Sequence, residues 1–132
     1  MRVDPYLYFD GRCEEAVDFY VKTVGAEVAA LVRFKDGGAP SAPGTADKIL
    51  HAELRIGDTK VMASDGECRG KPSFLGFTLA LSVATIEEAE RLFAALGKDG
   101  RVQLPLAPTP FAARFGMLFD RFGVSWSVVS QK

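Results

Sequence analysis

The sequence predicts an α+β protein in which one supersecondary unit occurs twice. Residues 49–64 and 116–130 each contain two β-prone runs joined by a short turn, at Gly57-Asp58 and at residues 120–123. A segment with helical spacing of apolar residues precedes each hairpin. In each half, one further β-prone run precedes the helical segment and another follows it in the sequence. The order strand, helix, strand, strand, strand is therefore expected in both halves.

Length and composition predict a single domain. The chain has 132 residues, and we expect one domain over residues 1–132, with a first module at about 1–66, a linker at about 66–73 and a second module at about 74–132.

The charge and hydropathy of the chain bear on its partners. The formal net charge of -1 argues against a nucleic-acid partner. No apolar run approaches the ~20 residues that span a bilayer, so no membrane partner is expected. Without an export signal, Cys13 and Cys68 are interpreted as reduced thiols of a cytoplasmic protein.

The first half is expected to contain a strand over 3–9, a helix over about 13–24, a strand over 27–34 and a hairpin of strands 49–56 and 59–64. Pro5 favours an edge position for the first strand. Asp10 is expected to start the helix by accepting hydrogen bonds from free backbone amides, and Gly25 to end it. Residues 35–47 are rich in Gly, Ala, Pro and Ser, which predicts a long loop that could cover a pocket.

The second half repeats this order, with strands expected over 74–83, 101–104, 113–119 and 124–129. Thr85 and Glu88 match a capping box, in which hydroxyl and carboxylate each cap a backbone amide, and the helix should end at Gly97. Trp126 is predicted to be buried between sheet and helix, where a large aromatic side chain contributes most.

Motifs spread over nearly the whole chain carry a family resemblance. They are Pro5-Tyr6-Leu7-Tyr8-Phe9-Asp10-Gly11, Glu15-Ala16, Phe19-Tyr20, His51-Ala52-Glu53-Leu54-Arg55-Ile56, Met62-Ala63-Ser64-Asp65, Gly76-Phe77-Thr78-Leu79 and Asp120-Arg121-Phe122-Gly123-Val124-Ser125-Trp126. The chain resembles the vicinal oxygen chelate superfamily of glyoxalases, bleomycin-resistance proteins and dioxygenases. Within it, the chain is most similar to the PhnB-like group, also labelled 3-demethylubiquinone-9 3-methyltransferase-like.

The resemblance implies the glyoxalase/bleomycin resistance fold. In that fold two βαβββ modules form curled mixed sheets around a ligand cavity, with the helices outside, and a homodimer is usual. The methyltransferase label has no support from the residues. The usual methyl-donor fold is doubly wound and has a Gly-rich turn after its first strand, which this sequence lacks.

Metal-dependent members of the superfamily use four inward-facing His or Glu ligands. The resemblance carries these positions onto Pro5, Met62, Thr78 and Ser127. None of the four supplies the carboxylate or imidazole that such cations need. We therefore expect no metal ion and no other cofactor.

The carried-over positions and the period of two along a strand predict an inward face that is apolar with a few hydroxyl groups. The expected ligand-binding residues are Leu7, Phe9, Met62, Ser64, Thr78, Ser125 and Ser127. The alternative is that these side chains only fill a core.

His51 and Glu53 share one face of the strand 49–56 with Arg55. One interpretation is a solvated or dimer-facing edge stripe. The other is a catalytic proton-transfer pair, since imidazole titrates near neutral pH and a carboxylate can orient it. Asp65 is expected to cap a turn or to close the pocket.

These observations favour a protein that binds a small organic molecule in a metal-free cavity, with the reaction left open. Two alternatives stay open. One is a metal-dependent lyase, isomerase or dioxygenase of the same superfamily. The other is a protein that sequesters an antibiotic without changing it.

Overall fold

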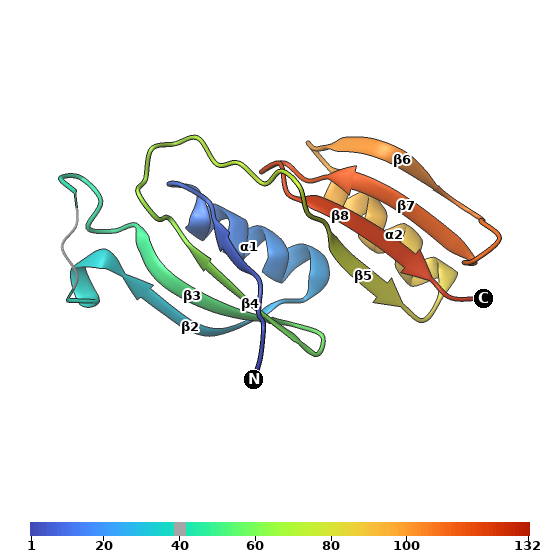
Figure 1. Ribbon diagram of the computed structural model, residues 1–132, viewed down its shortest axis with the longest axis horizontal. Helices are drawn as coiled ribbons and strands as arrows, with labels where there is room; N and C mark the ends of the chain where they lie inside the picture. Colours follow the sequence, from blue (N-terminus) through green and yellow to red (C-terminus); the bar gives the residue numbers. More distant parts are fainter. Residues whose placement is uncertain (39–41) are drawn as a thin grey trace. The chain divides into compact units, whose positions relative to one another are not determined.

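The computed structural model describes residues 1–38 and 42–132, which form two compact units, Met1–Ser73 and Phe74–Lys132 (Figure 1). Unit 1 contains β1 (Tyr6–Tyr8), α1 (Cys13–Val24), β2 (Glu27–Arg33), the short 3-10 helix η1 (Phe34–Asp36), β3 (Ile49–Ile56) and β4 (Thr59–Ser64). Unit 2 contains β5 (Leu79–Val83), α2 (Ile86–Gly97), β6 (Arg101–Ala107), β7 (Arg114–Phe119) and β8 (Ser125–Ser130). The predicted α+β repeat is confirmed.

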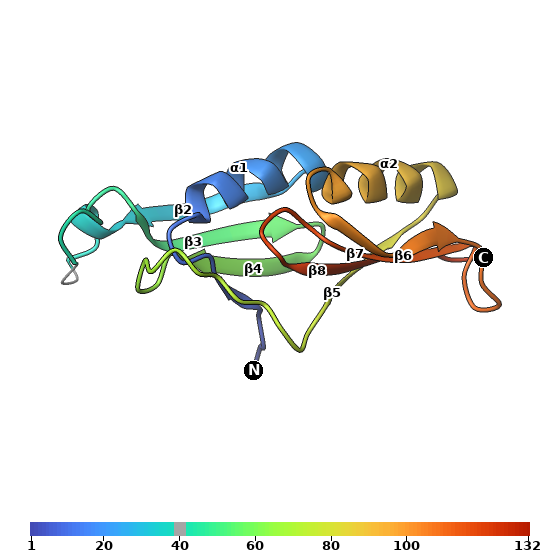
Figure 2. The same ribbon diagram turned by 90° about the horizontal axis from the view of Figure 1, so that it is seen from above.

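Each unit has one four-stranded mixed sheet with the same topology. The strand order is β1-β4-β3-β2 in unit 1 and β5-β8-β7-β6 in unit 2. The first strand of each unit pairs in parallel with the last, and the other pairs are antiparallel. In each unit the helix lies along one face of the sheet (Figure 2). We call the opposite face, which no described helix of the same unit covers, the open face.

In unit 1 the core lies between α1 and its sheet. The helix buries the stripe that its apolar spacing predicts, and the Phe9 ring lies 6.1 Å from that of Tyr20. Gly25 ends the helix in the left-handed conformation, as expected. Neither α1 nor α2, the longer helices among residues 1–38 and 42–132, is long and apolar enough to cross a membrane.

In unit 2 the core lies between α2 and strands β7 and β8. Leu118 pairs with Trp126, and both side chains are buried, which confirms the predicted burial of the tryptophan. Thr85 accepts a hydrogen bond from the backbone N–H of Glu88, which confirms one half of the predicted capping box. Gly116 also faces the helix, because a Cβ at this position would lie 2.7 Å from the Phe93 ring.

Gly116→Ala is expected to destabilise the protein by about 1–3 kcal/mol, since its Cβ would also meet the Leu106 backbone at 2.9 Å. A backbone cannot move aside as a flexible side chain can. Gly97→Ala is the matched control, because its Cβ would make only an ordinary 3.6 Å contact with Leu118. Urea unfolding followed by circular dichroism measures both variants. Equal stability of the two would contradict this packing.

Two predicted strands begin at least three residues later than expected. β1 starts only at Tyr6, after Pro5, and β5 starts at Leu79 because Gly76 adopts a positive φ of 85° in the preceding turn. β6 instead extends beyond its predicted end to Ala107 and includes Pro105, which an edge strand tolerates. Of the predicted loop over 35–47, the first residues belong to η1, and residues 39–41 lie outside the described part of the chain.

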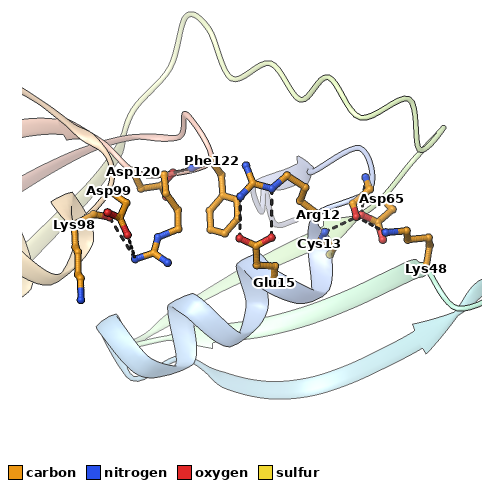
Figure 3. Close-up of polar contacts among 11 residues, drawn as sticks. Arg12, Cys13, Glu15, Lys48, Asp65, Lys98, Asp99, Asp120 and Phe122 are labelled. Carbon is orange, nitrogen blue, oxygen red and sulfur yellow. Dashed lines mark hydrogen bonds and ion pairs between the residues drawn. The ribbon is translucent and has the colours of Figure 1, made fainter.

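The start of α1 differs from the prediction. Asp10 does not cap the helix: its carboxylate accepts hydrogen bonds from the backbone N–H groups of Arg69 and Lys71. The buried carboxylate of Asp65 takes that role instead, accepting from the backbone N–H groups of Gly11 and Cys13 (Figure 3). A residue at the end of β4 therefore holds the beginning of α1.

Candidate functional site

The open face of unit 1 gathers polar side chains from three neighbouring strands. Tyr6 on β1 pairs with Met62 on β4, and Met62 pairs with Glu53 on β3. His51 lies two residues before Glu53, so it points to the same face. These four side chains therefore meet on the face of the sheet opposite α1.

A continuous chain of hydrogen bonds crosses this face. The Tyr6 hydroxyl lies 2.7 Å from His51 Nδ1, and His51 Nε2 lies 3.2 Å from Glu53 Oε1. Lys60 Nζ lies 3.2 Å from the same oxygen of Glu53. The side chains of His51, Glu53 and Lys60 are each about one-third exposed. We call Tyr6, His51, Glu53 and Lys60 the polar relay.

The electrostatics of the polar relay fix where its protons lie. Hydrogen bonds from His51 and then from Lys60 lower the pKa of Glu53, so this carboxylate is ionised at neutral pH. Burial, followed by the charges of Tyr8, Cys13 and Glu53, raises the pKa of Tyr6, so the phenol keeps its proton. Since an ionised carboxylate only accepts, the hydrogen bond to Glu53 needs a hydrogen on His51 Nε2. In the neutral imidazole, Nδ1 is then the acceptor for the Tyr6 hydroxyl.

Glu53 and Lys60, at one end of the polar relay, line a hollow of about 590 Å³ on unit 1. Charges of both signs dominate its lining, which consists of Arg2, Asp4, Ala29, Glu53, Leu54, Arg55, Asp58, Thr59 and Lys60. Arg2 pairs with Asp4 and Lys60 with Glu53. Of the ligand-binding side chains predicted for this unit, none lines this hollow.

Leu7 and Phe9 do not lie on the open face, and their prediction as ligand-binding residues is wrong. Leu7 pairs with Ala63 and is 3% exposed, and Phe9 packs on Tyr20 of α1. A shift of one residue along a strand moves every side chain to the other face. Since Tyr6 and not Leu7 pairs with Met62, the tyrosines of β1 occupy the open face.

Three other expectations for unit 1 need correction. Ser64 is buried, and its hydroxyl accepts the Gly66 N–H at 2.9 Å, so it holds the turn after β4. His51 and Glu53 do not form an edge stripe, because β3 lies between β2 and β4. Asp65 is 1% exposed and bonds three distant backbone amides, so it neither caps a local turn with its side chain nor closes a pocket.

The open face of unit 2 carries the predicted hydroxyl groups. Ser127 pairs with Ala80, and Thr78 Oγ1 lies 2.8 Å from Ser125 Oγ, so the three predicted residues share the face opposite α2. Thr78 and Ser125 line a hollow of about 350 Å³. The rest of its lining is mainly apolar, namely Phe74, Leu75, Gly76, Phe77, Gln103, Met117 and Phe119. We call this the hydroxyl hollow.

Large apolar side chains stand exposed beside the two hydroxyls. Leu75 is 85% exposed and Phe77 is 40% exposed. The guanidinium of Arg101 lies 4.7 Å from the centre of the Phe119 ring, where it screens one side of that ring. Exposed apolar side chains beside a few hydroxyls are typical of a ligand site.

The residues at the carried-over metal positions do not fit a divalent cation. Pro5, Met62, Thr78 and Ser127 offer a backbone carbonyl, a thioether and two hydroxyls, and Thr78 already bonds Ser125. The Pro5 carbonyl accepts the backbone N–H of Met62. In residues 1–38 and 42–132, no three His, Cys, Asp or Glu side chains gather where they could hold a metal ion.

Neither cysteine of the chain offers a reactive thiolate. Cys13 is fully buried, and burial, followed by the charges of Asp65 and Glu14, raises the pKa of its thiol far above the usual range. Burial also raises the pKa of Cys68, which is partly exposed. Both thiols are therefore protonated at neutral pH and are poor nucleophiles.

Sequence reasoning did not find Tyr6 and Lys60 as members of the polar relay. A usable signal was present in β1: in the run Tyr6-Leu7-Tyr8-Phe9, the two purely apolar side chains alternate with tyrosines. Leu and Phe are buried more often than Tyr, so alternation alone favours Leu7 and Phe9 on the core face. Lys60 gave no such signal, because its partner lies on another strand.

Comparison with known proteins identifies the chain. The model of the family described as 3-demethylubiquinone-9 3-methyltransferase matches residues 1–129. The chain belongs to this family. Protein YjdN of Escherichia coli K12 is 36% identical over 140 residues, with 97% of this chain and 94% of YjdN covered. An uncharacterized Mycobacterium tuberculosis protein, Rv0887c, is 32% identical over 133 residues, covering 96% of this chain and 72% of that protein.

Several solved structures share the fold of this chain. Protein PA1353 from Pseudomonas aeruginosa is 42% identical, with a TM-score of 0.86 and coverage of 99% of this chain and 98% of that one. A PhnB protein from Bacillus cereus is 27% identical, with a TM-score of 0.83 and coverage of 98% and 99%. A glyoxylase/bleomycin resistance protein/dioxygenase domain from Frankia, 14% identical with a TM-score of 0.65, covers 99% of this chain and 95% of that one.

The predicted similarity to the PhnB-like group is thereby confirmed, and the fold is the one found in the glyoxylase/bleomycin resistance protein/dioxygenase domain. The fold is not the usual methyl-donor fold that the word methyltransferase in the family's description would suggest. Each sheet contains a single parallel pair of strands, whereas the doubly wound methyl-donor fold is built on a mostly parallel sheet.

Proposed function

We propose that the protein binds a small, largely apolar organic molecule in the hydroxyl hollow of unit 2, without a metal ion. The pair of hydroxyls formed by Thr78 and Ser125, set among exposed apolar side chains, is the observation that carries this proposal. The two hydroxyls can donate to and accept from one polar group of the ligand, while Phe77 and Met117 contact its apolar part.

The size and polarity of the hydroxyl hollow support this class of ligand. Its volume of about 350 Å³ is near the lower end of ligand pockets, which suits a molecule with one ring. Leu75 and Phe77 leave apolar surface in water that a ligand would cover. The donor set at the carried-over positions supports binding without a metal ion, because carboxylate and imidazole are missing there.

We further propose that the protein works as a homodimer. Each unit exposes one face of a mixed sheet, and the superfamily resemblance implies pairing of such faces. Analytical ultracentrifugation of the purified chain tests this, and a monomer at micromolar concentration would contradict it.

A screen of one-ring aromatic fragments by ligand-observed NMR tests the proposed ligand class. For fragments that bind, Thr78→Val with Ser125→Ala is expected to weaken affinity about tenfold, since two hydrogen bonds of modest net strength are lost. Ser82→Ala is the matched control, because Ser82 pairs with Val129 on the same face but outside the hollow. Fragments that bind the double variant as tightly as the wild type would refute the hydroxyl hollow as the site.

The same complexes separate a binding protein from an enzyme. Mass spectrometry of a bound molecule after long incubation shows whether it is recovered unchanged. An unchanged ligand supports sequestration, and a changed one supports catalysis.

A further inference from the structure

We propose that Tyr6 is the acid–base group at the end of a directional proton relay on the open face of unit 1, with His51 as its proton acceptor. The relay would act on a small organic molecule that carries a weakly acidic O–H or C–H group. The inference rests on the proposed function in that it needs a small ligand, but it uses other residues and a different unit.

The geometry of the relay gives it a direction. Glu53 Oε1 receives hydrogen bonds from both His51 and Lys60, so its charge is already compensated and it is a weak base. His51 Nδ1 has the Tyr6 hydroxyl as its hydrogen-bond partner, at 2.7 Å. A proton can therefore enter the relay most easily from the phenol.

The proton transfer balances within the relay. The O–H bond of Tyr6 breaks while an N–H bond forms at His51 Nδ1. The phenol oxygen takes a proton from the ligand in the same step, and the ligand keeps the electron pair. The imidazolium that results lies 3.2 Å from the Glu53 carboxylate, which stabilises its positive charge. The reverse step returns the proton to the ligand.

Neighbouring side chains hold the phenol in place for this role. The Tyr6 ring stacks on Tyr8 with centroids 4.9 Å apart and planes 10° apart. The centroid of the Tyr6 ring also lies 5.6 Å from that of the His51 ring. These two ring contacts hold the Tyr6 ring in place, so that its hydroxyl stays hydrogen-bonded to His51.

Labelling with benzenesulfonyl fluoride tests the relay in the free protein. The phenol oxygen attacks sulfur, the S–F bond breaks, fluoride leaves and the phenolic proton passes to His51. The chain has three tyrosines, of which Tyr20 is buried and Tyr8 is 54% exposed. Exposure alone would favour Tyr8, so faster labelling of Tyr6 at neutral pH, located by peptide mass spectrometry, is the expected result.

Two variants test whether His51 causes the faster labelling of Tyr6. His51→Gln keeps a polar side chain but cannot accept the proton, so the labelling rate of Tyr6 should fall on the order of 100-fold while that of Tyr8 stays unchanged. Glu53→Gln should lower the Tyr6 rate about tenfold, because the imidazolium loses its anionic partner. Preferential labelling of Tyr8 in the wild type, or an unchanged Tyr6 rate in His51→Gln, would overturn the relay.

A second measurement needs no variant. His51 is the only histidine of the chain, so nitrogen-15 NMR of the wild type reports on this ring alone. The relay requires the hydrogen on Nε2, and a hydrogen on Nδ1 would overturn it. Neither measurement involves Thr78 or Ser125, so failure of the relay and failure of the proposed ligand site are read separately.

Discussion

Asp65→Ala is expected to lower the free energy of unfolding by about 4 kcal/mol, because two buried and one partly buried backbone N–H groups lose their acceptor. Oδ1 of Asp65 accepts from Gly11 and Cys13 at 2.8 Å each, and Oδ2 accepts from Ile49 at 2.8 Å. The carboxylate is 1% exposed, so water cannot replace it without opening the structure. Urea unfolding followed by circular dichroism gives the change in free energy.

Asp10→Ala is the comparison for this prediction. Its carboxylate also accepts two backbone N–H groups, those of Arg69 and Lys71, but these bonds are exposed to solvent. Water can take the place of an exposed acceptor, so this variant should be much closer to the wild type. Equal losses in the two variants would show that burial of Asp65 is not the reason for its importance.

Asp120→Ala is expected to have the second largest effect, a loss of about 3 kcal/mol together with a change in tryptophan fluorescence. Oδ1 of Asp120 accepts from the backbone N–H groups of Phe122 and Val124, and Oδ2 accepts from Trp126 Nε1 at 2.9 Å. Removing the carboxylate leaves buried donors without this acceptor. The turn between β7 and β8 and the indole ring should loosen together.

The fluorescence is unambiguous because Trp126 is the single tryptophan of the chain. An emission shift to longer wavelength is expected in Asp120→Ala as the indole gains water. Asp99→Asn serves as the control, since this carboxylate is 70% exposed and faces Arg121 at 3.5 Å. Exposed ion pairs contribute little, so its stability and emission should match the wild type. An Asp120→Ala protein with unchanged emission would refute the coupling.

Local sequence signals predicted the regular elements well. The bounds of α1, β3 and β4 match the prediction residue for residue, because helical spacing, alternation and the turn at Gly57-Asp58 act over a few neighbours. Gly25 and Thr85 were predicted for the same reason, since each acts on the backbone of its own helix.

The candidate site was predicted only in part. His51 and Glu53 were found together because they lie two residues apart on one strand. Thr78 and Ser127 came from the carried-over superfamily positions, and Ser125 followed from the period of two along its strand. Leu7 and Phe9 were wrong because the register between β1 and β4 decides which face they occupy. That register joins two strands more than 50 residues apart. Alternation within β1 favours Leu7 and Phe9 on the core face, but the carried-over position at Pro5 assigned them to the other face.

The sequence by itself determined the repeated strand and helix order, the bounds of α1 and the apolar stripe of each helix. Those features follow from spacing and backbone conformation within short segments. The tertiary structure decided that Asp65 starts α1, with its partners 54, 52 and 16 residues away, and that Tyr6 joins His51 across the sheet. These contacts depend on which segments meet in space, through strand pairing and through the packing of α1 on its sheet.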